Sequence, residues 1–184
     1  MSGSWFHPLT PAWQDRLGFA PSDLFTMRWD RIFSSALVTS GGTTFWLAFG
    51  LMIVLVLIAE RLTGSYRASL SFWIGHLGAS IGGALFIWVA LQFHHSALME
   101  EIYTLRDVGP SAGYFGCMGL ITACFPRPWK YLVGLTAIGG LIGGMIVSAQ
   151  LGKTIDVAAG FSHLIAFPLG WGIATAPFLK KPRA

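Results

Sequence analysis

Ser111 and His163 are the two residues of this sequence that could form the catalytic pair of a serine hydrolase. Ser111 lies in Gly109-Pro-Ser-Ala-Gly113, at the start of an apolar, glycine-rich segment, and His163 lies within a later apolar segment. A serine hydroxyl becomes a nucleophile when a neighbouring imidazole takes its proton. The two residues therefore predict nucleophilic catalysis if the fold brings their side chains together.

Each residue also has an ordinary structural explanation. Serine is favoured at helix N-caps, and taken alone this is the better explanation of Ser111. An ionisable side chain within a membrane span is rare and costly, which makes His163 a functional candidate. A neutral histidine bonded to a backbone carbonyl or to Ser162 is equally common. The pair is more specific than either member, because an isolated cap and an isolated core histidine have no reason to share a depth in the fold.

The residues Gly109 to Gly113 also fit the G-x-S-x-G nucleophile elbow of α/β-hydrolases. That motif requires a strand before the serine and a helix after it, within a soluble sheet. No alternating strand pattern precedes Ser111, so we reject this interpretation.

The composition indicates an all-α, polytopic membrane protein. Of the 184 residues 54% are hydrophobic and only 11% are charged, far from the average of soluble domains. Most of the lysines and arginines lie in short connections between apolar runs, where they set topology. We therefore expect no nucleic-acid partner.

The chain divides into an N-terminal arm, a bundle and a short tail. Residues 1–40 contain aromatic residues among Pro, Asp and Arg but no run of about 18 apolar residues, which indicates an interfacial arm ending in a short re-entrant helix. Residues 41–179 form the bundle, and residues 180–184 form a basic cytoplasmic tail. Five apolar segments are long enough to span a bilayer. They run roughly over Thr43–Ala59, Leu70–Phe93, Pro110–Phe125, Tyr131–Ala149 and Val157–Phe178.

The distribution of basic residues favours an outer N-terminus and an inner C-terminus. Inner positions are then Arg61, Arg67, Arg127, Lys130, Lys180, Lys181 and Arg183, against Arg16, Arg28, Arg31, Arg106 and Lys153 outside. In this topology Ser111 falls at the outer start of the third segment, and His163 lies about 10 Å into the fifth. The pair is thus expected on one side of the bilayer at compatible depths.

Pairs of small residues, four positions apart, predict close helix packing within one compact bundle. They are Gly78 and Gly82, Gly139 and Gly143, Gly140 and Gly144, and Ala166 and Gly170. Arg106, in the loop before Ser111, is expected to be a surface charge on the outer face.

Other histidines offer weaker sites. His76 is flanked by Gly75 and Gly78, which would let a flat ligand such as haem or chlorophyll approach, but a hydrogen-bonded core histidine is the better explanation. A metal site could be formed by His94, His95, Glu100 and Glu101. Their spacing lacks evident tetrahedral or facial geometry, so a solvated loop is favoured. We expect no cofactor and no metal.

The sequence resembles the rhomboid family of intramembrane serine proteases over about residues 18–179. Four stretches carry the resemblance: Arg31-Ile-Phe-Ser-Ser-Ala-Leu-Val38, Leu57-Ile-Ala-Glu-Arg-Leu-Thr-Gly64, Gly109-Pro-Ser-Ala-Gly-Tyr-Phe-Gly-Cys-Met-Gly119 and Ser162-His-Leu-Ile-Ala-Phe-Pro-Leu-Gly170. They are similar to the segment before the family's second helix, the Glu-Arg signature at that helix's inner end, the serine motif and the histidine helix. The resemblance implies that Ser111 is the nucleophile and His163 the general base, cleaving a partner's transmembrane helix.

The sequence departs from the family at three points. Where the family has a histidine followed by an oxyanion-binding His and Asn, this chain has Thr39, Thr44 and Ala48. Thr44 can still donate one hydrogen bond, and backbone groups near the serine, Gly109 among them, are candidates for the rest of the oxyanion site. The family's first span is absent, and Ala112 follows the serine in place of glycine.

Two functions follow from the resemblance. One is an intramembrane serine protease in the bacterial cytoplasmic (inner) membrane, acting on a transmembrane protein substrate. The other is a non-catalytic relative that holds transmembrane helices as an accessory or assembly subunit of a larger membrane complex.

Overall fold

The structure is a computed structural model that describes residues 6–176. The described residues form helices joined by short connections, with no β-strand among them. The elements are α1 (Pro11–Leu17), the 3₁₀ helix η1 (Pro21–Leu24), α2 (Asp30–Leu37), α3 (Thr43–Thr63), α4 (Ser65–Phe93), α5 (Ala97–Thr104), α6 (Ser111–Ala123), α7 (Trp129–Gln150) and α8 (Thr154–Thr175). The expected all-α fold is confirmed for this part of the chain; the tail at 180–184 lies outside it.

Four described helices, α3, α4, α7 and α8, are long and apolar enough to cross a membrane. They correspond to four of the five expected spans. The remaining expected segment forms α6, which has 13 residues. At a rise of 1.5 Å per residue α6 is about 20 Å long, shorter than a hydrocarbon core of about 30 Å. Length and composition therefore support a membrane-embedded helical bundle whose serine helix is a short one.

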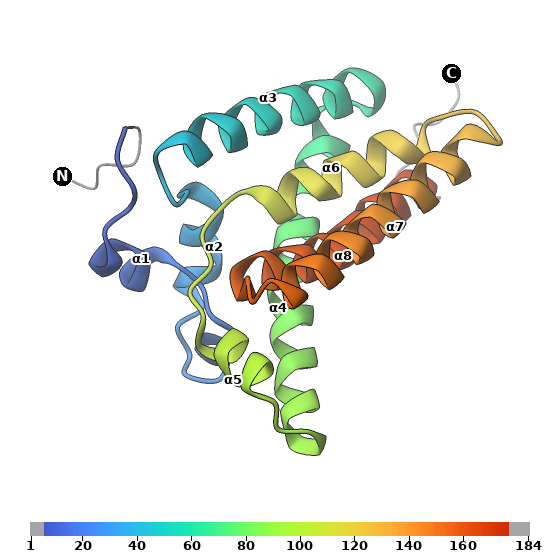
Figure 1. The fold of residues 1–184 in the computed structure, drawn as a ribbon. Coiled ribbons are helices and arrows are strands. Elements are labelled where there is room, and N and C mark those ends of the chain that lie inside the picture. Colours follow the sequence, from blue (N-terminus) through green and yellow to red (C-terminus); the bar gives the residue numbers. More distant parts are fainter. Residues whose placement is uncertain (1–5, 177–184) are drawn as a thin grey trace.

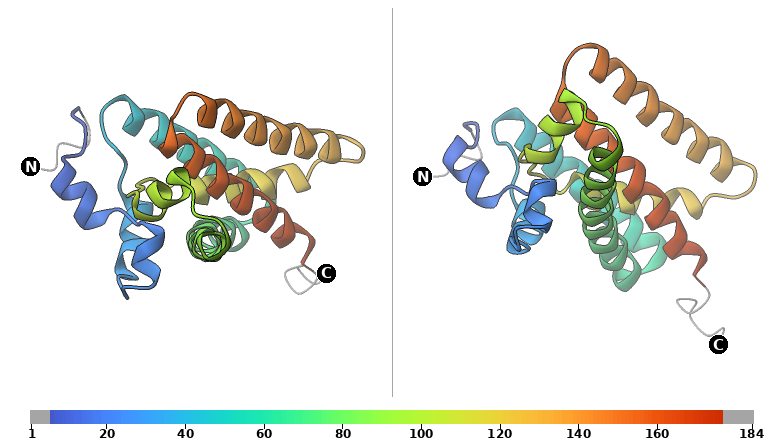
Figure 2. Two further views of the ribbon diagram at one scale, coloured as in Figure 1. Left: turned by 60° about the horizontal axis from the view of Figure 1, so that its bottom comes forward. Right: turned by 90° about the horizontal axis from the view of Figure 1, so that it is seen from below.

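Helix α4 crosses the other long helices (Figure 1). In the left view of Figure 2 it is seen almost end-on, while α3, α7 and α8 run across the view. Helix α6 lies inside this arrangement and packs against α3, α4, α7 and α8. Nine residues of α6 are buried, compared with two of α3 and one of α7. The helix that begins with Ser111 is therefore the core of the bundle.

Helices α4, α6 and α8 meet at a crossing of small residues. The Ser71 hydroxyl of α4 donates a hydrogen bond of 2.8 Å to the carbonyl oxygen of Gly116 in α6. A Cβ atom on Gly170 of α8 would overlap that same carbonyl and would lie 2.9 Å from Ser71 Oγ. Glycine is required at position 170 because the backbones of α6 and α8 approach too closely for any side chain.

The expected small-residue pairs have mixed outcomes. Gly170 is in close contact as predicted, and Gly78 and Gly82 face α8 side chains. Four of the five glycines of α7 are different: a Cβ on Gly139, Gly140, Gly143 or Gly144 would meet nothing within 4 Å among the described residues. The prediction that Gly139, Gly140, Gly143 and Gly144 mediate contacts within this bundle is therefore wrong. Helix α7 is held mainly through α8 and leaves a glycine-rich face open.

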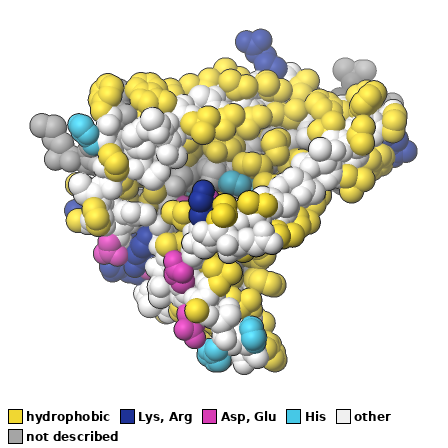
Figure 3. Space-filling model, in the orientation of Figure 1, with side chains coloured by type: hydrophobic (Ala, Val, Ile, Leu, Met, Phe, Trp, Pro, Cys, Tyr) yellow, Lys and Arg dark blue, Asp and Glu magenta, His cyan; other side chains and the backbone are white. Residues whose placement is uncertain are grey.

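Exposed apolar side chains cover the long helices. Those of α3 include Trp46, Leu47, Val54, Leu57 and Leu62, and those of α7 include Leu132, Leu135, Ile146 and Val147. In Figure 3 hydrophobic side chains dominate the upper part of the visible face, whereas acidic side chains lie over its lower left part. Such an apolar surface is unfavourable in water and suits contact with lipid.

The N-terminal arm packs into the bundle. Phe19 and Ile32 are buried in a cluster with Ala84 of α4, joined by Leu24 and Leu77. The short helix expected before residue 40 is present as α2. The arm thus does more than rest on an interface, because it buries apolar side chains against α4 and α5.

Replacing Gly170 with alanine is expected to destabilise the bundle, because the new methyl group would overlap the Gly116 carbonyl. Overpacking of this kind typically costs about 1–3 kcal/mol. Gly172 lies in the same helix and a Cβ there meets nothing within 4 Å, so Gly172→Ala is the matched control. Thermal unfolding in detergent, followed by circular dichroism, should show a lower midpoint for Gly170→Ala only. Equal midpoints would show that the crossing is not a tight constraint.

Candidate functional site

Ser111 is the first residue of α6. Gly109, with a φ of 148°, and Pro110 lead the chain into the helix, and Pro110 occupies the N-cap position. No side-chain hydrogen bond caps the helix, and the Ser111 hydroxyl makes no hydrogen bond within the described residues. The cap explanation of this serine is therefore not what the structure shows. Its hydroxyl is half-buried and available.

His163 of α8 lies beside the first turn of α6. Its imidazole stacks on the ring of Phe115, one helical turn after Ser111, with ring centroids 3.9 Å apart and an interplanar angle of 11°. His163 therefore contacts the helix that begins with Ser111. Residue Ser162, the alternative partner, donates its hydroxyl to the Ala158 carbonyl instead, at 3.1 Å.

The Nε2 atom of His163 is buried and has no hydrogen-bond partner in residues 6–176. A buried polar nitrogen without a partner is costly and calls for an explanation. No hydrogen bond joins it to Ser111 in this structure. The arrangement supplies a free imidazole nitrogen on α8, which packs against the helix that carries the free hydroxyl.

Ser111 lines a cavity of about 220 Å³ together with residues of α4, α5, α8 and the arm. Its walls are mainly apolar, and its polar members include Ser35, His76, Asp107 and Ser111. His163 lines a separate groove between α7 and α8, with Gly140, Gly144 and Gly160. Met145 lines both spaces.

His76 is a buried core histidine with 4% of its surface exposed. Its Nε2 lies 2.8 Å from the carbonyl oxygen of Ile32, and its Nδ1 has no partner in the described chain. A Cβ on the flanking Gly75 would meet the Ala112 carbonyl, and Gly78 faces Leu169, so both glycines already contact helices. No space is left at these glycines for a flat pigment.

The remaining candidates lie apart from the serine. Thr44 is exposed at the start of α3 and does not line the cavity, whereas Thr39 and Ala48 are buried elsewhere. Gly109 does line the cavity, but its N–H donates to the Ser35 carbonyl at 2.8 Å. Neither Thr44 nor Gly109 therefore offers a free hydrogen-bond donor beside Ser111.

The segment that joins α4 to α5 holds no metal-binding cluster among the described residues. Within residues 6–176 no group of three His, Cys, Asp or Glu side chains could hold a metal ion. His95 and Glu100 form a pair at 3.4 Å, with side chains 76% and 61% exposed. His94 and Glu101 are also exposed.

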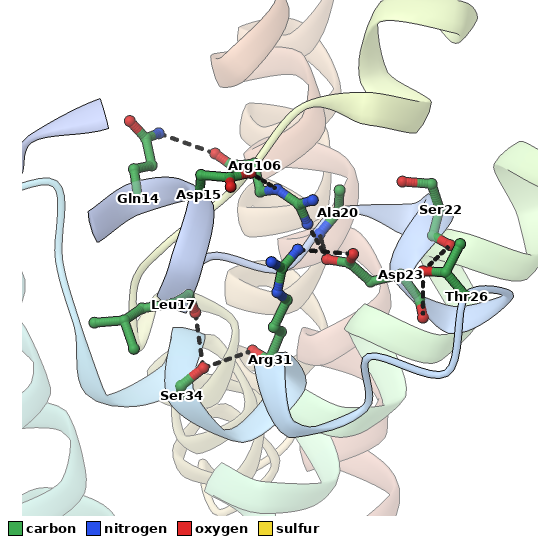
Figure 4. Close-up of polar contacts among 10 residues, drawn as sticks. All are labelled: Gln14, Asp15, Leu17, Ala20, Ser22, Asp23, Thr26, Arg31, Ser34 and Arg106. Carbon is green, nitrogen blue, oxygen red and sulfur yellow. Dashed lines mark hydrogen bonds and ion pairs between the residues drawn. The ribbon is translucent and has the colours of Figure 1, made fainter. Parts of the chain in front are cut away.

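A charged network missed by sequence reasoning holds the loop before the serine. Asp23 of η1 is buried and pairs with Arg31 of α2 at 3.0 Å and with Arg106 of the loop. Arg106 also pairs with Asp15 at 3.0 Å, and its carbonyl accepts a hydrogen bond from Gln14 (Figure 4). The prediction that Arg106 is a plain surface charge is wrong, because it ties α1 and η1 to the serine loop.

Backbone hydrogen bonds hold the same loop. Phe19 and Asp107 exchange two bonds of 3.0 and 2.9 Å, and Gly109 bonds to the Ser35 carbonyl of α2. The loop residues just before Ser111 are therefore fixed by the arm on one side and by α6 on the other. Only the run of arginines and acids in the arm hinted at this in the sequence.

Burial raises the pKa of the Asp107 carboxyl above its ordinary value, and a hydrogen bond from Val108 opposes this shift. Desolvation disfavours the charged form of a carboxyl group, so the folded state binds this proton more tightly than the unfolded state does.

In comparisons with protein-family models, curated proteins and solved structures, no match to this chain is found.

The substitution Asp23→Asn is expected to destabilise the protein by about 3–5 kcal/mol, because it leaves the buried Arg31 without its charged partner. Asp15 also pairs with Arg106 but its side chain is 71% exposed, so Asp15→Asn should cost less than about 1 kcal/mol. Thermal unfolding and limited proteolysis of the arm would measure both. Similar losses in the two variants would argue against a structural role specific to the buried pairs.

The raised pKa of the Asp107 carboxyl predicts that the stability of the protein depends on pH. The folded state retains this proton to a higher pH than the unfolded state. Its contribution is therefore largest below the unfolded pKa and is lost as the pH rises through the folded pKa. Asp107→Asn should unfold at a higher temperature than wild type at about pH 8, with the difference shrinking towards pH 4. Parallel pH profiles for the two proteins would contradict the assignment.

Proposed function

We propose that this chain is an intramembrane serine protease of the rhomboid type, with Ser111 as nucleophile and His163 as general base. The observation that carries the proposal is the unpartnered, buried Nε2 of His163 next to the helix that presents the free Ser111 hydroxyl. Proton transfer to a positioned histidine typically contributes about 10²–10⁴ in rate. Stacking on Phe115 would hold the imidazole in place without a third catalytic residue.

The start of α6 supplies the proposed oxyanion site. The first N–H groups of a helix have no acceptor within the helix, and the helix dipole places partial positive charge there. Ser111, Ala112 and Gly113 contribute these groups. They offer donors in place of Thr44, which is exposed, and Gly109, whose N–H is already bonded. Each oxyanion donor is typically worth about 10²–10³ in rate.

The proposed substrate is a transmembrane segment of another protein. The four long helices around the site are apolar enough to cross a membrane, and α6 would be a fifth, embedded segment. The expected topology, with an outer N-terminus in the bacterial inner membrane, places Ser111 towards the outer side. The enzyme would cut where a substrate helix unwinds near this level.

The second candidate is a non-catalytic subunit that holds a partner's transmembrane helix. One observation favours it: the glycine face of α7 meets nothing in the described chain, and small residues allow close helix contact in lipid. In this case Gly139→Leu should release a co-purifying membrane protein, and Ser111→Ala should have no effect on it. A monomer recovered alone from gentle detergent would count against this function.

The decisive measurement is labelling by a fluorophosphonate probe in native membranes. Wild type should be labelled, Ser111→Ala should not, and His163→Ala should label at least 10²-fold more slowly. Ser162→Ala is the matched control, because this serine lines the same cavity but is bonded to Ala158. It should label like wild type. A folded wild type that is not labelled would refute the protease function and favour the non-catalytic subunit.

A further inference from the structure

The cavity that contains Ser111 also contains a second imidazole, that of His76. Its Nε2 lies 2.8 Å from the Ile32 carbonyl oxygen, which can only accept a hydrogen bond. Nε2 therefore carries the proton in the neutral ring, and Nδ1 carries the lone pair. Because Nδ1 is buried without a partner in the described chain, His76 presents an unused acceptor and base.

The cavity is large enough to hold water beside His76. An ordered internal water typically needs about 10–15 Å³ of accessible space and two to four polar partners, and this cavity measures about 220 Å³. Its polar lining includes the hydroxyls of Ser35 and Ser111 and the Asp107 carboxyl. Most other lining residues are apolar, so a bound water would be directed to these few groups.

We infer that His76 is a second acid–base residue, which positions and activates the water that hydrolyses the acyl-enzyme. This inference rests on the proposed protease function. His163 would take the Ser111 proton during acylation and deliver it to the leaving amine. In deacylation the water oxygen bonds to the acyl carbon while its proton passes to His76 Nδ1. The bond from the acyl carbon to Ser111 Oγ then breaks, and the serine oxygen recovers that proton as the carboxylic acid product departs.

The two histidines line different spaces. His76 lines the cavity with Ser111, whereas His163 lines the groove between α7 and α8, and Met145 lines both. A water held in the cavity shares that space with His76. The assignment gives a use to the unpartnered nitrogen of a buried histidine that lines the serine's own cavity.

The test compares acylation with turnover in the purified protein in lipid nanodiscs. His76→Gln keeps a side-chain N–H for the Ile32 carbonyl but is no base. We expect fluorophosphonate labelling of Ser111 within about twofold of wild type. With p-nitrophenyl hexanoate, the variant should release one p-nitrophenol per Ser111 in a burst and then turn over at least 10²-fold more slowly than wild type.

Added hydroxylamine, which attacks an acyl-enzyme without a base, should restore turnover in His76→Gln. Ser162→Ala is the control and should behave like wild type, because this serine lines the same cavity but its hydroxyl is bonded to the Ala158 carbonyl. The inference is overturned if His76→Gln turns over normally, or if it loses labelling and burst together, which would mark a structural role. A wild type that fails to label refutes the underlying protease instead, so the two failures are distinct.

Discussion

The close crossing of α4, α6 and α8 is the constraint on which the rest of the structure depends. Apolar surface does not drive helices together in lipid, so packing of backbone against backbone and buried hydrogen bonds must do so. Here the Ser71 hydroxyl bonds to the Gly116 carbonyl, and Gly170 admits that carbonyl against its own backbone. Three helices are thereby locked at one point without any large side chain between them.

The candidate site is built within two helical turns of that crossing. Ser111 precedes Gly116 on α6, His76 follows Ser71 on α4, and His163 precedes Gly170 on α8 by about two turns. Side chains so close to a fixed contact have little freedom to drift, which is the condition for precise catalytic geometry. The arm supplies the complementary restraint, since its buried carboxylate Asp23 pairs with arginines from both sides and holds the loop before the serine.

Local patterns in the sequence predicted what depends on local physics. Four apolar segments became long helices, and the histidine of the last of them contacts Phe115 of the serine helix. Contacts between distant segments were beyond such patterns. No pattern around Arg106 indicates that it pairs with Asp23, which lies far away in the sequence. The glycine spacing of α7 likewise does not distinguish a packed helix face from an open one. The same spacing at Gly170 does lead to contact, because the backbone of α6 approaches it there.

The shortness of α6 connects the fold to the proposed chemistry. A helix of about 20 Å cannot reach both surfaces of a core of about 30 Å. Its first turn can therefore lie below the surface, covered by the arm and α5, with unsatisfied N–H groups in a medium of low dielectric constant. Partial charges act more strongly there than in water. A full-length helix would place the same serine at the interface, where water would screen these dipoles. Burying the start of α6 thus concentrates the field of a helix terminus on the position where negative charge would develop.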